Sequence, residues 1–404
     1  MNIPDAEFPN DESTTKSEAR LSRNDSVGRA SVPARIVANP MYGPQTDHNP
    51  NRTVCCSANL TRLAGRDARP TGQIQGGTRI PTTSFRLRRF RHSSFCIRHS
   101  TALLLALLIA VTTAHSRLNV VVTTPDIASL AQVVGGDKIE LVTLARPTED
   151  PHFVDAKPSF IVKLNRADAL IEGGAELETG WLPPLLTGGR NARLASGSAG
   201  YILANEGVQM LEVPKSLDRS EGDIHAAGNP HFLVDPENAK LVARHLADAF
   251  CKLDTANCAT YQANLKQFID QLDARMVEWQ KQLAPFKGGQ IVAYHNSWVY
   301  FARRFELKID LFLEPKPGIP PSPAHLASVI TRMKADKAHV IIVDPYLNRR
   351  TAETVARNTG ATVVDVAQFP GGVKGTEGGY IALMDYLVNS LAKALGTPAS
   401  GPAR

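Results

Sequence analysis

An amphipathic run over residues 259–283 constrains the fold of this 404-residue chain most strongly, because it contains no glycine or proline. Its apolar residues recur at intervals of three and four, which is the spacing of one face of an α-helix. They are Tyr261, Leu265, Phe268, Ile269, Leu272, Met276, Trp279 and Leu283. A helix of this length extends roughly 37 Å, about the diameter of a domain. The run therefore predicts either an ordinary long surface helix or a rod that joins two lobes.

Short β-branched segments alternate with helical patterns on both sides of this run. Before it we predict strands at 118–124, 138–144 and 167–171, and helices at 127–134, 158–164, 177–186 (interrupted by Pro-Pro) and 236–252. After it we predict strands at 290–294, 308–313, 339–343 and 361–366, and helices at 298–305, 322–334, 350–358 and 380–395. Alternation at this spacing is typical of parallel βα units. Because the pattern restarts after the long helix, a joining rod is the favoured interpretation.

The predicted fold class is therefore α/β, with two lobes of parallel sheets flanked by helices and joined by one long rigid helix. We place an N-terminal lobe at 117–255, the linking helix at 256–286, a C-terminal lobe at 287–397 and a tail at 398–404.

Residues 1–96 differ from the rest of the chain. They are rich in Ser, Thr, Asn, Arg, Pro and Gly and show no sustained apolar periodicity. Such a segment cannot bury enough apolar surface to offset the entropy of ordering it. We expect residues 1–96 to be a disordered extension, or one that results from a wrongly assigned start codon.

A secretory signal peptide is predicted over residues 97–116. Basic residues precede an apolar run at 101–111, and small residues follow at Thr112, Ala114 and Ser116. The run is too short to span a bilayer as a helix, and the combination is typical of a cleaved signal. A buried core helix is the alternative. No cysteine follows closely, so we expect no lipid anchor and a mature chain that is not embedded in the membrane.

The net charge of +6 is unevenly distributed along the chain. Residues 1–116 hold 15 basic and 8 acidic side chains, whereas the remainder holds 30 basic and 31 acidic ones. A nucleic-acid-binding protein needs a basic folded domain. The neutral folded part therefore argues against a nucleic-acid partner.

Of the five cysteines, only Cys251 and Cys258 follow the apolar run. They lie seven residues apart across a predicted helix–turn–helix, without a histidine at the spacing of a zinc site. In an oxidising compartment we expect a disulfide between them, with free thiols as the alternative.

Three histidines stand in predicted loops. His152 and His231 each follow a proline, which restricts the backbone on both sides of the peptide bond and holds the imidazole on a stiff loop. His295 comes just after a predicted strand, where parallel sheets present ligand-binding loops. Taken singly, each is an ordinary polar residue. Together they suggest one metal site, and three imidazoles suit zinc, with other divalent first-row metals as alternatives.

A series of motifs extends this interpretation. In chain order they are Val122-Thr-Thr-Pro-Asp126, Gly135-Gly-Asp137, Asp150-Pro-His152 with Pro158-Ser159, Ala167-Asp-Ala-Leu-Ile-Glu-Gly-Gly-Ala-Glu-Leu-Glu178 with Trp181, Asn229-Pro-His231 with Asp235-Pro236, His295 with Tyr300-Phe301-Ala302, and Pro317-Gly-Ile-Pro-Pro-Ser-Pro323. Over about 118–397 the chain resembles the zinc and manganese periplasmic solute-binding proteins of bacterial ABC importers.

The resemblance implies a monomeric, non-catalytic receptor in the periplasm. It would capture a divalent transition metal, Zn²⁺ first and Mn²⁺ or Fe²⁺ second, in the cleft between the lobes. It would then deliver the ion to an ABC permease and its ATPase. His152, His231 and His295 fall on three positions where the family binds metal.

Two departures from the family leave the fourth ligand open. The His- and Asp-rich loop of many zinc receptors is reduced to residues 221–225, which end in His225. The carboxylate that many relatives take from the second lobe is absent from residues 368–372, although Asp365 and Glu377 flank them. The candidates are His225, Asp365, Glu377 or a water molecule.

Two other classes of function remain as alternatives. One is a three-histidine zinc metallohydrolase, although no His-Glu-x-x-His signature is present. The other is a periplasmic metallochaperone or adhesin.

Overall fold

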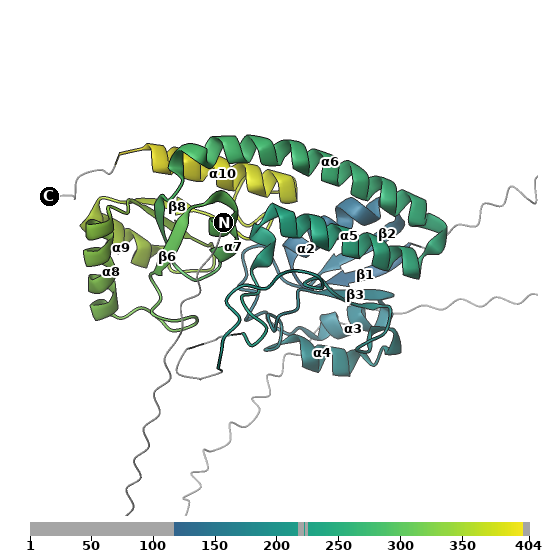
Figure 1. The fold of residues 1–404 in the computed structure, drawn as a ribbon. Coiled ribbons are helices and arrows are strands. Elements are labelled where there is room, and N and C mark those ends of the chain that lie inside the picture. The colour runs from purple at the N-terminus through teal and green to yellow at the C-terminus, as the bar shows by residue number, and fades with distance from the viewer. Residues whose placement is uncertain (1–116, 217–221, 223–224, 399–404) are drawn as a thin grey trace, which may run out of the picture. The chain divides into compact units, whose positions relative to one another are not determined.

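A computed structural model describes residues 117–216, 222 and 225–398 (Figure 1). The predicted extension at 1–96, the signal peptide at 97–116 and residues 399–404 of the tail lie outside the described residues. Chain positions 117–398 contain two four-stranded sheets in which every pair of strands is parallel. The predicted α/β fold class is confirmed.

The first sheet has the strand order β2-β1-β3-β4. Its strands are β1 (Leu118–Val122), β2 (Ile139–Thr143), β3 (Ala169–Glu172) and β4 (Tyr201–Leu203). The accompanying helices are α2 (Pro125–Gly135), α3 (Pro158–Arg166), α4 (Leu182–Gly189) and α5 (Pro236–Leu253). We call this part the N-terminal lobe.

The second sheet has the order β6-β5-β7-β8, so both sheets place their strands in the same relative order. Its strands are β5 (Gln290–Ala293), β6 (Lys308–Phe312), β7 (Val340–Val343) and β8 (Thr362–Asp365). The helices are α7 (Val299–Phe305), α8 (Pro323–Asp336), α9 (Arg349–Thr359) and α10 (Tyr380–Gly396). We call this part the C-terminal lobe. All four residues of β7 are buried, as expected for an inner parallel strand with both faces covered.

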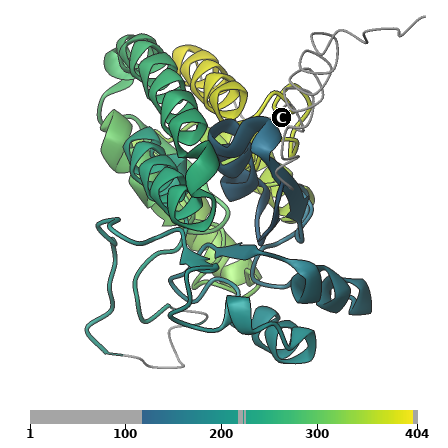
Figure 2. The same ribbon diagram turned by 90° about the vertical axis from the view of Figure 1, so that its right-hand side faces the viewer.

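The long helix α6 (Cys258–Leu283) joins the two lobes. It packs on α2 and α5 of the N-terminal lobe and on α10 of the C-terminal lobe, and α6 and α10 lie side by side in both views (Figure 1, Figure 2). Seven of its eight predicted apolar positions are buried, and Ile269 is partly buried. One apolar core contains residues of both sheets together with this face of α6. The predicted rod between two lobes is confirmed.

Side chains at the helix starts explain several boundaries. The Asp235 carboxylate accepts a hydrogen bond from the Glu237 backbone amide at 3.0 Å, and Pro236 occupies the first turn of α5. Helix α8 is capped in the same way, because the Ser322 hydroxyl accepts a hydrogen bond from the His325 backbone amide.

The prediction of a Pro-Pro interruption within a helix at 177–186 was wrong. Helix α4 begins at Leu182, so Pro183 and Pro184 lie in its first turn. Backbone amides there have no intrahelical partner, and proline therefore costs no hydrogen bond. Strand β4 was not predicted, because three residues are too short for a pattern.

The structure joins Cys251 and Cys258 in a disulfide between the end of α5 and the start of α6. None of the helices within residues 117–398 that the structure describes is long and apolar enough to cross a bilayer.

Candidate metal centre

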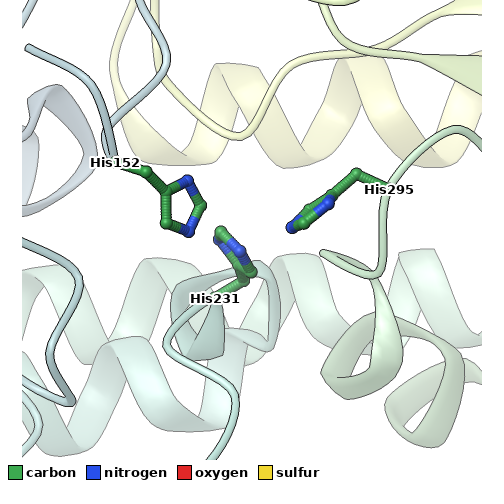
Figure 3. Close-up of side chains that lie close together, drawn as sticks. All are labelled: His152, His231 and His295. Atoms are coloured by element: carbon green, nitrogen blue, oxygen red, sulfur yellow. The ribbon is translucent and has the colours of Figure 1, made fainter. Parts of the chain in front are cut away.

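The three loop histidines come together between the lobes. His152 follows β2, His231 precedes α5 and His295 follows β5. Each offers a ring nitrogen, and these three atoms all lie within 4.8 Å of one another. Figure 3 shows the imidazoles turned toward a common space from three separate loops. A spacing of this kind allows one cation to contact all three rings.

Asp150 fixes the orientation of His152. Its carboxylate accepts a hydrogen bond from the His152 backbone amide at 3.0 Å and lies 2.7 Å from Nδ1 of the same residue. The carbonyl of Pro151, between them, accepts a hydrogen bond from the Trp181 indole at 2.9 Å. With its Nδ1 proton donated to a carboxylate, the ring presents the Nε2 lone pair to the centre.

The carboxylate of Asp150 stays ionised beside this ring. Burial alone would raise its pKa, but the hydrogen bonds from His152 and the nearby His295 ring outweigh burial and lower the pKa of Asp150.

Glu314 plays the same part for His295. Its Oε2 lies 2.8 Å from Nδ1 of His295, and both side chains are largely buried. The Glu314 amide donates to the Tyr294 carbonyl at 3.0 Å, which ties the loop after β6 to the end of β5. None of the motifs quoted from the sequence contains Glu314. The structure shows that it orients a candidate ligand.

His231 is the most buried of the three rings. Its backbone amide donates to the Asn229 side chain at 3.1 Å. Burial, followed by the neighbouring His152, His295 and His225 rings, lowers the pKa of His231 well below its usual value. Its Nε2 is buried and has no hydrogen-bond partner among the described residues. A neutral imidazole with an unpartnered buried nitrogen is the state that a metal ion requires.

His225 lies beside this group but is not part of it. Its ring stacks on His152, with 5.3 Å between centroids and 27° between planes. Among the described residues, its nitrogens are not within the 4.8 Å group. The amide of Ala226 donates to Oε2 of Glu176 at 2.6 Å, which holds the loop against the N-terminal lobe.

The two carboxylates considered as fourth ligands are engaged elsewhere. Asp365 forms an ion pair with Arg349 on the surface. Glu377 accepts a hydrogen bond from the Gly375 amide at 2.8 Å. Neither belongs to the group of three histidines among the residues that the structure describes.

Two hollows adjoin the three rings. The larger has a volume of about 330 Å³ and is lined by Glu212, Pro214, His225, Gly228, Asn229, Pro230, His231, His295, Asn296, Pro315, Lys316 and Pro317. The smaller, of about 30 Å³, is lined by Asp150, His152, Phe153, His295, Glu314, Gly318, Tyr346 and Leu347. His295 borders both, so the candidate centre lies between them.

Glu212 connects the loops of the two lobes behind the site. Its Oε2 accepts hydrogen bonds from the side chains of Asn229, at 2.9 Å, and Asn296, at 2.8 Å. Nδ2 of Asn229 also donates to the Asn296 backbone carbonyl at 2.8 Å. Glu212 adopts a positive φ of 53°, and no sequence signal distinguishes it.

A buried polar cluster of the C-terminal lobe, made of Asp344, Tyr346 and Gln368, also escaped sequence analysis. Burial raises the pKa of Asp344 to about 7. The Gln368 amide nitrogen donates to the Tyr346 hydroxyl at 2.6 Å and to Asp344 at 3.4 Å. One signal could have revealed it. Asp344 comes directly after an apolar strand, at the edge where parallel sheets carry their sites.

Comparison with known proteins identifies the family of this chain. The model of the ZnuA family, "Zinc-uptake complex component A periplasmic", matches residues 120–394. The chain belongs to this family. ZnuA-family proteins are substrate-binding components of metal transporters and not enzymes, so the metallohydrolase alternative is set aside.

Curated relatives of this ZnuA-family chain carry the names of different metals. The metal ABC transporter substrate-binding lipoprotein ScbA of Streptococcus cristatus is 26% identical over 295 residues, which are 70% of this chain and 90% of that protein. The manganese lipoprotein scaA of Streptococcus gordonii is 25% identical, over 69% and 89% of the two chains. The iron lipoprotein MtsA of Streptococcus pyogenes is 23% identical, over 70% and 91%.

A solved structure shares the fold. The crystal structure of ZnuA superimposes with a TM-score of 0.59 at 23% sequence identity and covers 70% of this chain and 100% of its own.

Proposed function

We propose that this ZnuA-family chain binds one Zn²⁺ ion through Nε2 of His152, His231 and His295 and delivers it to an ABC permease and its ATPase. The observation that carries the proposal is the convergence of three ring nitrogens within 4.8 Å, one of them a buried nitrogen without a hydrogen-bond partner. Asp150 and Glu314 support it, because each fixes the tautomer of a candidate ligand.

Zinc is the proposed ion because the candidate ligands are nitrogens. Among the described residues, the group within 4.8 Å contains no carboxylate. Imidazoles suit zinc, whereas manganese prefers oxygen ligands. Mn²⁺ and Fe²⁺ are the alternatives, since relatives are named for these metals.

We assign the fourth coordination position to His225, with water as the alternative. The His225 ring is already in contact with His152, and its loop contains glycine at position 222, where φ is +81°. A rotation of this side chain would bring a fourth nitrogen to the ion. His225 also borders the larger hollow, through which an ion can enter.

We propose that the mature protein functions in the periplasm. Export would use the signal peptide at 97–116, and the mature monomer would consist of lobes at 117–255 and 287–397 joined by residues 256–286. An oxidising compartment suits the disulfide between Cys251 and Cys258.

Elemental analysis and competitive titration with Zn²⁺ and Mn²⁺ test this function. We expect one zinc per chain, bound more tightly than manganese. His152→Ala, His231→Ala and His295→Ala should each lower zinc affinity by at least 10-fold, and His225→Ala should lower it less. His325→Ala is the control, because His325 contacts the Phe312 carbonyl away from the group. Unchanged zinc affinity in the first three variants would refute the proposal.

A further inference from the structure

The side chain of Asn229 joins the loops of two candidate ligands from different lobes. Its Oδ1 accepts a hydrogen bond from the His231 backbone amide at 3.1 Å, and its Nδ2 donates to the backbone carbonyl of Asn296 at 2.8 Å. Asn296 directly follows His295. The ring centroids of His231 and His295 lie 5.5 Å apart (Figure 3). One buried side-chain amide therefore bridges the backbones that carry these two rings.

Glu212 fixes the orientation of this amide. Its Oε2 accepts the second hydrogen bond from Nδ2 of Asn229, at 2.9 Å, and one from Nδ2 of Asn296, at 2.8 Å. A reversed Asn229 amide would place its NH₂ against the His231 N–H and its oxygen against a carbonyl and a carboxylate. Both amide protons and the oxygen are therefore used in a single orientation.

The backbone of Asn229 is held by the C-terminal lobe as well. Its carbonyl accepts a hydrogen bond from the Tyr300 hydroxyl at 2.8 Å, and Tyr300 is fully buried on α7. The same hydroxyl accepts from the Leu211 backbone amide at 2.9 Å, while the Asn229 backbone amide donates to the Leu211 carbonyl at 2.8 Å. Pro230 restricts the next residue. The residue that precedes Pro230 and His231 is thus fixed relative to α7.

We propose that Asn229 is a positioning residue that sets the separation of the His231 and His295 rings and thereby favours Zn²⁺ over larger divalent ions. The inference rests on the proposed metal site and adds a role for Asn229. Zn–N bonds of about 2.0–2.1 Å require the ligand nitrogens to lie close together, whereas the larger Mn²⁺ tolerates a wider spacing.

Asn191 provides a matched control, because it makes the same set of bonds elsewhere. Its Oδ1 accepts from the Arg193 backbone amide at 3.1 Å, and its Nδ2 donates to the carbonyls of Leu164, at 2.9 Å, and Ala167, at 2.8 Å. These residues stand between α3 and β4, within the N-terminal lobe. A purely structural role of such an amide should therefore look alike at both positions.

The experiment compares Asn229→Asp with Asn191→Asp. Each change keeps the size of the side chain and one acceptor oxygen, but removes both donated hydrogen bonds. Zn²⁺ and Mn²⁺ affinities are measured by competition. Nuclear Overhauser effects between ring protons of His231 and His295 report the ring separation in metal-free protein.

A second pair of variants tests the same bridge from its exposed end. Glu212→Leu removes the acceptor shared by the two asparagines, whereas Glu212→Gln keeps an oxygen that can accept both bonds. Glu212 is exposed, so both variants should fold.

We expect Asn229→Asp to lower the ratio of zinc to manganese affinity by about 10-fold or more, the usual effect of losing a partner of a metal ligand. The added negative charge attracts both divalent ions alike, so the ratio isolates the geometry. The Overhauser effect between the rings should weaken. Glu212→Leu should cause a smaller change of the same sign, while Glu212→Gln and Asn191→Asp should keep the wild-type ratio and Overhauser effect.

A wild-type ratio in folded Asn229→Asp would overturn the inference, and so would an equal fall in Asn191→Asp. If Asn229→Asp does not fold, equal ratios in Glu212→Leu and Glu212→Gln would overturn it. Failure of the proposed function looks different. In that case the wild-type protein would bind no zinc, while the Overhauser comparison on metal-free protein would still report on Asn229.

Discussion

At the scale of single residues, Glu314 shows how a neighbouring carboxylate orients the ring of a candidate metal ligand. Replacing Glu314 with Gln removes the anionic partner of His295 but keeps the shape of the side chain. We expect zinc affinity to fall by about 10-fold, because losing such a partner typically costs 10- to 100-fold. Competitive titration measures the change. Glu306→Gln, at an exposed ion pair with Lys287, is the control and should bind like wild type.

From the burial of Glu178 we predict that the unfolding free energy depends on pH. This carboxyl is fully buried, and burial followed by the charge of Glu172 raises its pKa to about 8. The folded protein therefore holds a proton that the unfolded chain releases near pH 4.5. Unfolding free energy should fall as pH rises from about 5 to 8, at roughly 1 kcal/mol per pH unit from this group.

Glu178→Gln copies the protonated side chain and removes this dependence. We expect the variant to match wild type near pH 5 and to exceed it in stability at pH 8. Denaturant unfolding at both values tests the sign. A stability difference between variant and wild type that stays constant with pH would show that Glu178 does not titrate as described.

The residue scale also shows what sequence could reveal. His152, His231 and His295 were identifiable because proline and strand ends marked their loops. The residues that bond to these rings were not identifiable from the sequence. Asp150 lies within a recognised motif, but its bond to His152 depends on a loop conformation, and Glu314 reaches the His295 ring from the loop after a different strand. Contacts between distant loops leave no local pattern.

At the scale of elements, α6 carries the connection between the lobes. Leu272 lies midway along it and is fully buried. Leu272→Ala should lower the unfolding free energy by about 2–5 kcal/mol, through lost burial and the cavity left behind. Val277→Ala on the same helix is the control, since Val277 is 66% exposed, and should change stability by less than about 0.5 kcal/mol. Equal effects would contradict the burial of this face.

Elements were predictable in proportion to their length and periodicity. Helix α6 was found within one residue of its bounds, because eight apolar positions repeat at helical spacing. Strand β4 contains only Tyr201–Leu203, and one of these is exposed, so its sequence carries no strand pattern. The start of α4 depends on whether two prolines end a helix or begin one, which the surrounding fold decides.

At the scale of the whole molecule, an ion pair links the lobes. Arg304 of α7 donates to both carboxylate oxygens of Asp235, at 2.6 and 3.0 Å, and Asp235 is fully buried at the start of α5. Arg304→Met should lower the unfolding free energy by about 2–3 kcal/mol, because it removes the cation that is hydrogen-bonded to both oxygens of a buried carboxylate.

Arg303→Met provides the matched control for this ion pair. Arg303 is 42% exposed and stands 3.9 Å from Asp235, so its loss should cost less than about 1 kcal/mol. Chemical denaturation of both variants gives the comparison. A larger loss in Arg303→Met would contradict the assignment of the link to Arg304.

The two-lobe arrangement could be predicted from the order of strands and helices along the chain. The meeting of the three histidines between the lobes was predicted from the family resemblance. Spacing along the chain alone left their convergence open. The structure supplies the physical reason, since loops of both lobes meet at the three histidines and are tied together through Glu212.

Anomalous diffraction at the zinc absorption edge from crystals of the zinc-loaded protein tests the central claim most directly. We predict one strong peak per chain, about 2.0–2.1 Å from Nε2 of His152, His231 and His295. A loaded protein whose zinc lies elsewhere, or whose three rings do not share one ion, would contradict it.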